Sequence, residues 1–241
     1  MQYPMKKLLL LVTVVLSGFI FTGAGNIHGT ISENNSFKTL ASDFSALYNE
    51  MGSQLAGLDA AVFNKAVAGF QKLNSRGSIK KDDIITIVDF SQPSTKKRLY
   101  VIDLEHKKVL FNTLVAHGKN SGTLWAKSFS NQPESLKSSP GFYTTAETYN
   151  GENGYSLRLD GHERNINSNA RNRAIVMHGA PYVNQSTINA MGYIGRSWGC
   201  PAVPVKEHKQ IINTIKGGTC LFIFSPDQSY VSRSTLINAN T

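Results

Sequence analysis

The segment Gly195-Arg196-Ser197-Trp198-Gly199-Cys200-Pro201-Ala202-Val203 contains one of only two cysteines and decides how the chain is interpreted. Gly199 permits tight backbone geometry directly before the cysteine. Pro201 biases Cys200 toward an extended conformation, which is typical of a turn that leads into a strand. The N–H groups of Gly199 and Cys200 are candidate donors to an oxyanion, because Pro201 has no N–H. The segment therefore predicts a sulfur with a fixed direction, as a nucleophile requires.

A second segment, Ile175-Val176-Met177-His178-Gly179-Ala180, is typical of a strand that ends in His-Gly. His178 can supply the imidazole that a cysteine nucleophile needs. From these residues alone, a buried cysteine and a hydrogen-bonded core histidine remain the alternative. The other cysteine, Cys220, lies in an apolar run at 218–224, where it is expected to be an inert core residue. A Cys200–Cys220 disulfide is a further alternative, and it would exclude Cys200 as a nucleophile.

The composition of the whole chain excludes several classes of protein. The 241 residues include 25 Lys and Arg against 16 Asp and Glu, with 41% apolar and 17% charged residues. So few charges are atypical of a coiled coil or a disordered charged tail, and the length suits one domain with a small attachment. Two cysteines make neither a disulfide scaffold nor a four-thiolate zinc site. A metal hydrolase built on His117, His178 and Cys200 is disfavoured, because the sequence has no His-x-x-x-His pair. No metal and no cofactor are expected.

Residues 1–25 have the pattern of a signal peptide. Lys6 and Lys7 precede an uncharged, mostly apolar run of 14 residues at 8–21, and small residues follow at 22–25. An uncleaved membrane anchor is the alternative, but this run is shorter than the about 20 residues that span a bilayer as a helix. We therefore expect export to the periplasm or cell envelope of a bacterium, with no integral membrane span after cleavage. The charge of +9 suits an anionic envelope. No nucleic-acid motif accompanies the scattered basic residues, so nucleic acid is not an expected partner.

Residues 26–80 are expected to form a polar tether and a helical N-terminal part. Apolar residues from Phe44 to Leu55 follow helical spacing, and a second helix is predicted from its N-cap Asp59 to about Asn74. The aromatic residues of these helices are interpreted as packing residues rather than as a ligand site.

From residue 84 the pattern changes to β-branched and aromatic runs, which predict a mostly β domain over 84–226. Strands are predicted at 84–90, 98–104, 109–116, 142–145, 156–159, 174–178 and 221–224. The polar stretches between them, at 118–139, 149–155 and 161–173, are expected to be loops. A short helix is expected at 206–215, and the tail at 227–241 is expected to be polar and peripheral.

The pair of motifs resembles the signature of a known family. His178-Gly179 followed by Ser197-Trp198-Gly199-Cys200 resembles the L,D-transpeptidase (YkuD-type) signature, which has a His, a spacer and a Ser/Thr-His-Gly-Cys element. Segments 115–118, 138–143 and 156–161 are similar to a divergent murein L,D-transpeptidase catalytic domain-like branch. The resemblance covers about residues 84–226, without the N-terminal helices. It implies a mainly β fold, an L,D-transpeptidase-like β-sandwich or barrel with one or two short helices, to which the chain adds a small α-helical N-terminal part.

The resemblance also implies roles for the motif residues. Cys200 matches the nucleophile and His178 the histidine that activates it. Gly179 matches the position whose backbone carbonyl orients the imidazole. Ser197 and Gly199 match the remaining motif positions near the oxyanion hole.

The sequence departs from the family pattern in two places. Trp198 stands where the motif has a second histidine, and the spacer at 179–196 is 18 residues, longer than usual. We expect Trp198 to line the substrate cleft instead. Arg196 and Arg158 are candidates for binding substrate carboxylates. His117, which like His178 ends a strand before a glycine, is either a further cleft residue in place of the missing histidine or a structural residue.

The implied function is cysteine-dependent acyl transfer in the cell wall. An imidazole–thiolate pair would attack a peptidoglycan tetrapeptide stem, release D-alanine and form a thioester acyl-enzyme. His178 would act as base and then as acid. Stem peptides are thus the expected partners, while the acceptor and the oligomeric state stay open. The alternatives are an L,D-carboxypeptidase or endopeptidase that uses water, and a degenerate peptidoglycan-binding protein.

Overall fold

The computed structural model describes residues 44–238, so the expected signal peptide and tether lie outside the described residues. The N-terminal part is helical, as predicted. Residues 44–51 form helical turns that continue into the 3₁₀ helix η1 (Gly52–Leu55). Helix α2 (Ala60–Ser75) begins where Asp59 accepts hydrogen bonds from the N–H groups of Ala61 and Val62, which confirms the predicted N-cap. Within 44–238, no helix is both long and apolar enough to cross a membrane.

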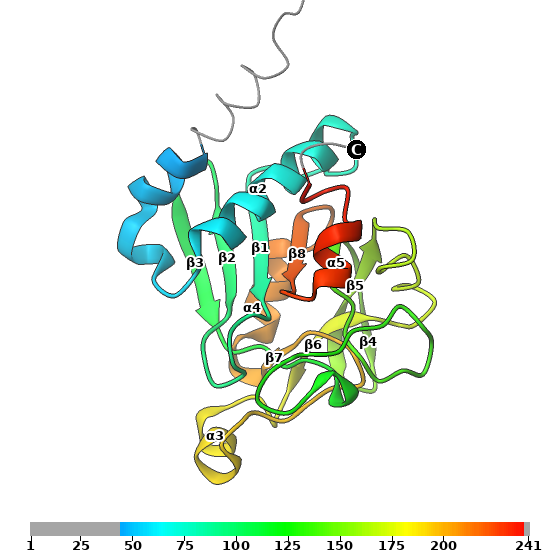
Figure 1. The fold of residues 1–241 in the computed structure, drawn as a ribbon. Helices are drawn as coiled ribbons and strands as arrows, with labels where there is room; N and C mark the ends of the chain where they lie inside the picture. The colour runs from blue at the N-terminus through cyan, green and yellow to red at the C-terminus, as the bar shows by residue number, and fades with distance from the viewer. Residues whose placement is uncertain (1–43, 239–241) are drawn as a thin grey trace, which may run out of the picture.

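Eight strands form a single mixed sheet in the order β3-β2-β1-β8-β4-β5-β6-β7 (Figure 1). Their bounds are β1 (Ile84–Asp89), β2 (Leu99–Asp103), β3 (Lys108–Thr113), β4 (Gly141–Gly151), β5 (Gly154–Gly161), β6 (Val176–Ala180), β7 (Ala202–Pro204) and β8 (Cys220–Phe224). Just after β3, Ala116 forms a bridge to Ala202 in β7. Because β3 and β7 are the two edges of the sheet, this bridge nearly closes it into a barrel. The expected mainly β fold with short helices is confirmed.

The two faces of the sheet pack into two different cores, because side chains alternate along each strand. Helix α2 covers one face, where Phe70 and other residues of α2 pack with Phe142 and Phe222. Helix α4 (Val205–Ile215) covers the other face, where Ile211 packs in a cluster with Tyr143 and other strand residues. The N-terminal helical part therefore packs directly on the sheet.

One of the three expected loops is part of the sheet instead. The polar stretch 149–155 is the tip of a long β4–β5 hairpin, in which Gly151 pairs with Gly154 across a two-residue turn. The tip is stabilised by hydrogen bonds across the hairpin, so it forms strands without the apolar residues on which the prediction depends. The sequence reading also missed β7 and two short helices, α3 (Gln185–Met191) and α5 (Gln228–Arg233).

The tail after residue 226 is not peripheral. Tyr230 of α5 and Leu236 are buried in the core under α2. Lys72 of α2 donates to the carbonyls of Thr235 and Asn238 at 2.8 and 2.6 Å. Together with the partly buried Val231 and Ile237, these two side chains dock the segment on the core.

Candidate active site

The pairing of β6 with β7 brings the segments of the two predicted reactive residues next to each other. His178 in β6 lies opposite Ala202 in β7. Cys200, two residues before Ala202, lies beside Val176, whose N–H donates to Cys200 Sγ at 3.5 Å. Val176 and His178 point to the same side of β6, because side chains two positions apart share a face. The sulfur therefore lies against the backbone of β6, two positions along the strand from His178.

The thiol of Cys200 is half-buried and has two backbone partners. Besides the bond from Val176, Sγ donates to the carbonyl of Ala174 at 3.6 Å. Burial raises the pKa of Cys200, while the Val176 N–H and the charge of Arg173 act in the opposite direction. Cys220 is fully buried in β8, and both cysteines are free thiols. The alternative of a disulfide is therefore not what the structure contains.

The imidazole of His178 has a defined tautomer. Its Nδ1 lies 3.0 Å from the carbonyl oxygen of Gly179, so the ring carries its hydrogen on Nδ1 and leaves Nε2 as the base. The side chain is only 4% exposed, and this burial lowers its pKa. The nearby His208 lowers that pKa further. Burial thus favours the neutral forms of both the thiol and the imidazole.

The motif turn is held together by Ser197. Its Oγ accepts from the N–H of Gly199 at 3.1 Å and donates to the carbonyl of Cys200 at 2.6 Å. The N–H of Gly199, one of the two predicted oxyanion donors, is thus engaged by Ser197 in this structure. The N–H of Cys200 has no acceptor among residues 44–238 and stays available to an oxyanion.

Gly199 is required by its conformation. Its φ is +129°, and a Cβ there would lie 2.8 Å from the carbonyl oxygen of Lys137. Any larger residue would both strain the backbone and push against this carbonyl. Gly199 also accepts a hydrogen bond at its carbonyl from Ser138 Oγ, at 3.1 Å. The loop at 118–139 thus holds the motif turn in place through its contacts with Gly199.

His117 supports the same turn from a buried position. Its carbonyl accepts from the N–H of Ser197 at 3.0 Å, and its side chain has no exposed surface. Arg98 lies 2.7 Å from Nδ1, and Nε2 lies 3.2 Å from the carbonyl of Gly122. Burial and the charge of Arg98 lower the pKa of His117 to about 4. His117 is therefore a neutral structural residue rather than a residue in contact with substrate, because Phe90 and Arg98 pack against it.

The two candidate arginines have different surroundings. Arg196 reaches the carbonyls of Lys119 and Gly122 at 3.4 and 3.3 Å, and so is held next to the motif turn. Arg158 in β5 pairs with Val176 in β6. Its side chain therefore shares a sheet face with Val176 and His178. It is half-buried.

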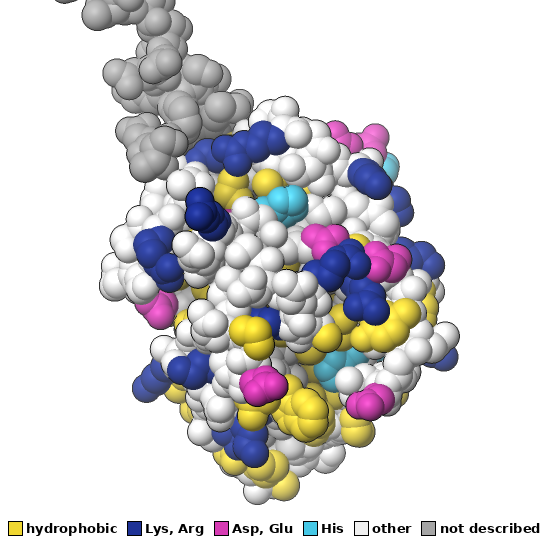
Figure 2. Space-filling model, turned by 90° about the vertical axis from the view of Figure 1, so that its right-hand side faces the viewer, with side chains coloured by type: hydrophobic (Ala, Val, Ile, Leu, Met, Phe, Trp, Pro, Cys, Tyr) yellow, Lys and Arg dark blue, Asp and Glu magenta, His cyan; other side chains and the backbone are white. Residues whose placement is uncertain are grey.

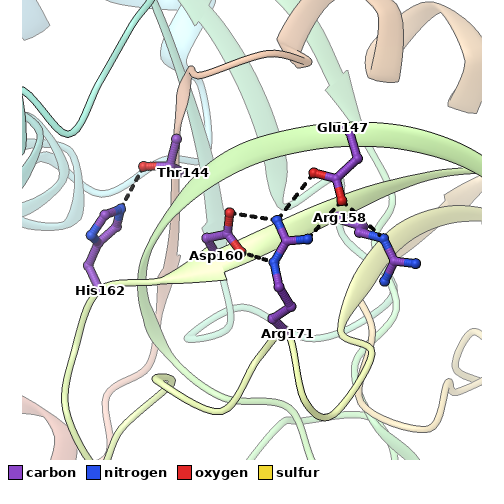
Figure 3. A network of polar contacts seen from close by, with 6 residues as sticks. All are labelled: Thr144, Glu147, Arg158, Asp160, His162 and Arg171. Atoms are coloured by element: carbon purple, nitrogen blue, oxygen red, sulfur yellow. Dashed lines mark hydrogen bonds and ion pairs between the residues drawn. The ribbon is translucent and has the colours of Figure 1, made fainter.

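An acidic and basic network continues from Arg158 across β4 and β5 (Figure 3). Arg158 Nε lies 3.3 Å from Glu147, and its guanidinium stands 4.4 Å from the ring centre of Tyr149. Arg171 joins Glu147 to Asp160, at 2.7 and 2.6 Å. Figure 2 shows acidic and basic side chains clustered beside hydrophobic groups and a histidine on the side of the molecule formed by this region.

Trp198 is 76% exposed, although it is adjacent to the buried Gly199. Trp125, in the loop at 118–139, is also exposed, at 41%. Trp198 thus presents its side chain to solvent, two positions before Cys200 in the sequence.

The sequence interpretation missed three residues around the reactive pair. Arg173 and Tyr182 both interact electrostatically with Cys200. His208 of α4, expected to lie on a helix face only, packs against Gly179, where a Cβ would come within 2.7 Å of its ring. Arg173 directly precedes the predicted strand, and Tyr182 follows its His-Gly end closely. Their closeness in sequence to His178 is therefore the signal that could identify Arg173 and Tyr182 as neighbours of the site.

Comparison with known proteins gives a family match and distant structural similarity. The profile of the family described as "L,D-transpeptidase catalytic domain" matches residues 54–224, and so includes α2, which the resemblance at the sequence level left out. No curated protein sequence matches.

Three solved structures are similar to this chain. An L,D-transpeptidase from Mycobacterium smegmatis shares 12% identity over 59% of each chain, with a TM-score of 0.37. One from Mycobacterium tuberculosis H37Rv shares 14% over 59% of this chain and 58% of that one, with a TM-score of 0.36. The helical cell shape determining protein Pgp2 from Campylobacter jejuni shares 14% over 78% and 57%, with a TM-score of 0.39. The chain thus spans less than two thirds of each solved chain.

Proposed function

Because the chain belongs to the L,D-transpeptidase catalytic-domain family, we propose that it is an exported cell-wall enzyme that transfers acyl groups between peptidoglycan stems. Cys200 is the nucleophile and His178 the base. The observation that supports the proposal is the position of the Cys200 sulfur against β6, at 3.5 Å from the Val176 N–H, two residues before His178, whose Nδ1 is fixed by the Gly179 carbonyl at 3.0 Å. Export rests on the pattern of residues 1–25, which lie outside the described part.

The first half-reaction forms a thioester. Since burial favours the neutral forms of both groups, the Cys200 thiol gives its proton to His178 Nε2 as the sulfur attacks the carbonyl carbon that precedes D-alanine. The Cys200 N–H stabilises the oxyanion. The tetrahedral intermediate then breaks its C–N bond, His178 returns the proton to the leaving amine, and D-alanine departs.

The second half-reaction passes the acyl group to an acceptor. An amine of a second stem attacks the thioester, His178 takes the proton, and the C–S bond breaks to restore the thiol. Trp198 lines the cleft, and Arg158 and Arg196 bind substrate carboxylates. Water in place of the amine gives an L,D-carboxypeptidase with the same residues. The second alternative is a peptidoglycan-binding protein without activity. The observation in its favour is that Trp198 stands at the position of the motif histidine.

The test is incubation of the mature protein with purified tetrapeptide muropeptides, followed by mass spectrometry. We expect loss of D-alanine with formation of cross-linked dimers, and neither product from Cys200→Ala. Loss of D-alanine without dimers would identify water as the acceptor. No reaction, together with unchanged peptidoglycan binding by Cys200→Ala, would establish the binding protein instead.

A further inference from the structure

Three groups near the beginning of β6 lie close to Cys200: a carbonyl, an N–H and a guanidinium. The Ala174 carbonyl and the Val176 N–H contact Sγ at 3.6 and 3.5 Å. Directly before them, the guanidinium of Arg173 lies against the residue that precedes the nucleophile, since a Cβ on Gly199 would be 3.3 Å from Arg173 Nη2. Ala174 has φ +52°, a left-handed conformation unusual for a residue other than glycine. This bend places Arg173 and the Ala174 carbonyl on the same side of the motif turn.

The charge of Arg173 is fixed in place but not neutralised. Nη1 donates to the carbonyl of Ser130 at 2.6 Å and to Ser139 Oγ at 2.5 Å. Nη2 donates to Ser135 Oγ at 3.1 Å and to the Lys137 carbonyl at 2.7 Å. All four acceptors are uncharged, and no carboxylate within residues 44–238 forms an ion pair with this side chain. Its Nε is buried without an acceptor.

Arg171, two residues earlier, provides the contrast. It forms ion pairs with Glu147 and Asp160, and it is largely exposed. Its charge is therefore cancelled locally and screened by water. The charge of Arg173 is half-buried among neutral groups, where a cation acts on a neighbouring thiol more strongly.

The other titratable groups near the sulfur do not supply a positive charge at neutral pH. Burial lowers the pKa of His178 and so keeps it neutral. Burial and the neighbouring Cys200 raise the pKa of Tyr182 to about 12, which keeps this hydroxyl neutral as well. Tyr143, which interacts with Arg173, is buried with a raised pKa and is also neutral. Arg173 is therefore the cation that faces the thiol within the described part of the chain.

We propose that Arg173 is a positioning residue that holds the motif turn and provides the positive charge that favours the thiolate of Cys200. The inference rests on the proposed function only for the role of Cys200 as nucleophile. A buried thiol is a poor nucleophile unless a nearby cation offsets the loss of hydration. A lower pKa of the thiol makes transfer of its proton to the neutral His178 less unfavourable.

The test measures the pKa of the Cys200 thiol without any peptidoglycan substrate. Native protein is alkylated with iodoacetamide across a pH series, and modification of the Cys200 peptide is quantified by mass spectrometry, which separates it from Cys220. Arg173→Gln is expected to raise the alkylation midpoint by about one pH unit, a tenfold loss of thiolate at neutral pH. Arg173→Lys is expected to stay near the wild-type midpoint. Arg171→Gln, the matched control, is expected to leave it unchanged.

A second variant keeps the test decisive if Arg173→Gln fails to fold, as judged by circular dichroism. Ser135→Asp retains Arg173 and places a carboxylate against Nη2, so it is expected to raise the midpoint as well. A wild-type midpoint in Arg173→Gln or in Ser135→Asp, or an equal rise in the Lys and Gln variants, would overturn the proposal. Because alkylation needs no substrate, a failure of D-alanine release with the expected midpoint shifts would count against the proposed function alone.

Discussion

At the scale of single residues, the buried polar groups around the motif decide which side chains can react. His117 and His178 both end a strand before a glycine, yet only one of them is a base candidate. Nδ1 of His178 faces a carbonyl, which leaves Nε2 free for a proton. Both ring nitrogens of His117 are engaged, by Arg98 and by the Gly122 carbonyl. Identical local sequence patterns therefore lead to different chemistry, because the partners come from elsewhere in the chain.

The lowered pKa of His117 makes stability dependent on pH. Its pKa is about 4 in the folded protein and about 6.5 in an unfolded chain. Between these values the unfolded state binds more protons, so the free energy of unfolding rises with pH through this window. The contribution is complete above about pH 6.5, and up to about 3 kcal/mol of it is lost by pH 4. Urea unfolding of wild type and His117→Asn at several pH values checks this.

The expected result is a steeper loss of stability in wild type than in His117→Asn between pH 6.5 and 4. Subtraction of the two curves removes the contributions of His162 and His178, whose pKa values are also lowered by burial. Parallel curves would contradict the assignment of a buried, neutral His117.

At the scale of elements, short helices and loops secure the site because they connect distant segments. Helix α5 ties the tail to the rest of the molecule, and just after it Ser234 donates to the buried Glu163. Glu163 in turn accepts from the N–H of Phe142 at 2.8 Å, at the start of β4. The C-terminal tail therefore fixes the loop at 161–173, which leads into Arg173 and β6.

Removal of the buried aromatic of α5 is expected to destabilise the whole protein. Tyr230 is 2% exposed in the core shared with α2. Tyr230→Ala should lower the free energy of unfolding by about 3 kcal/mol, as for other buried aromatic residues. Ser232→Ala, on the exposed side of the same helix, is the control and should change it by less than about 0.5 kcal/mol. Equal effects in chemical denaturation would show that the tail is peripheral after all.

At the scale of the whole molecule, the N-terminal helix and the sheet share one core. Gly69 of α2 lets the ring of Phe142 approach the helix backbone, since a Cβ there would lie 2.0 Å from that ring. Phe142 stacks on Phe222 at 4.2 Å between ring centres. The family profile also begins before α2, at residue 54. We therefore expect the helix and the strands to fold as one unit.

A chain that begins at residue 84 is thus expected not to fold cooperatively. It would expose the sheet face that α2 covers, including Phe142 and Phe222, and this loss of apolar burial exceeds the net stability of a typical domain. Thermal unfolding followed by circular dichroism should show no sharp transition for residues 84–241. A chain of residues 44–241 should retain one. A sharp transition in the shorter chain would instead support the division at about residue 80.

Much of the fold could be predicted from sequence, because strand alternation and helix caps are local signals. Asp59 was identified as an N-cap because its side chain bonds within its own turn. The strand at 84–90 was apparent because both faces are buried and apolar. The β4–β5 hairpin tip and α5 carried weak patterns, since their side chains are mostly polar and their stability comes from pairing and docking.

The sequence by itself determined the local conformation of the candidate pair, since Gly199, Cys200 and Pro201 dictate a constrained turn and His178 ends an apolar strand. Tertiary structure alone decided what surrounds that pair. Ser138 reaches Gly199 across 61 positions of sequence, and Arg173 comes to the thiol through the bend at Ala174. The physical reason is that backbone preference acts over a few residues, whereas burial and charge depend on closure of the sheet through the bridge from Ala116 to Ala202.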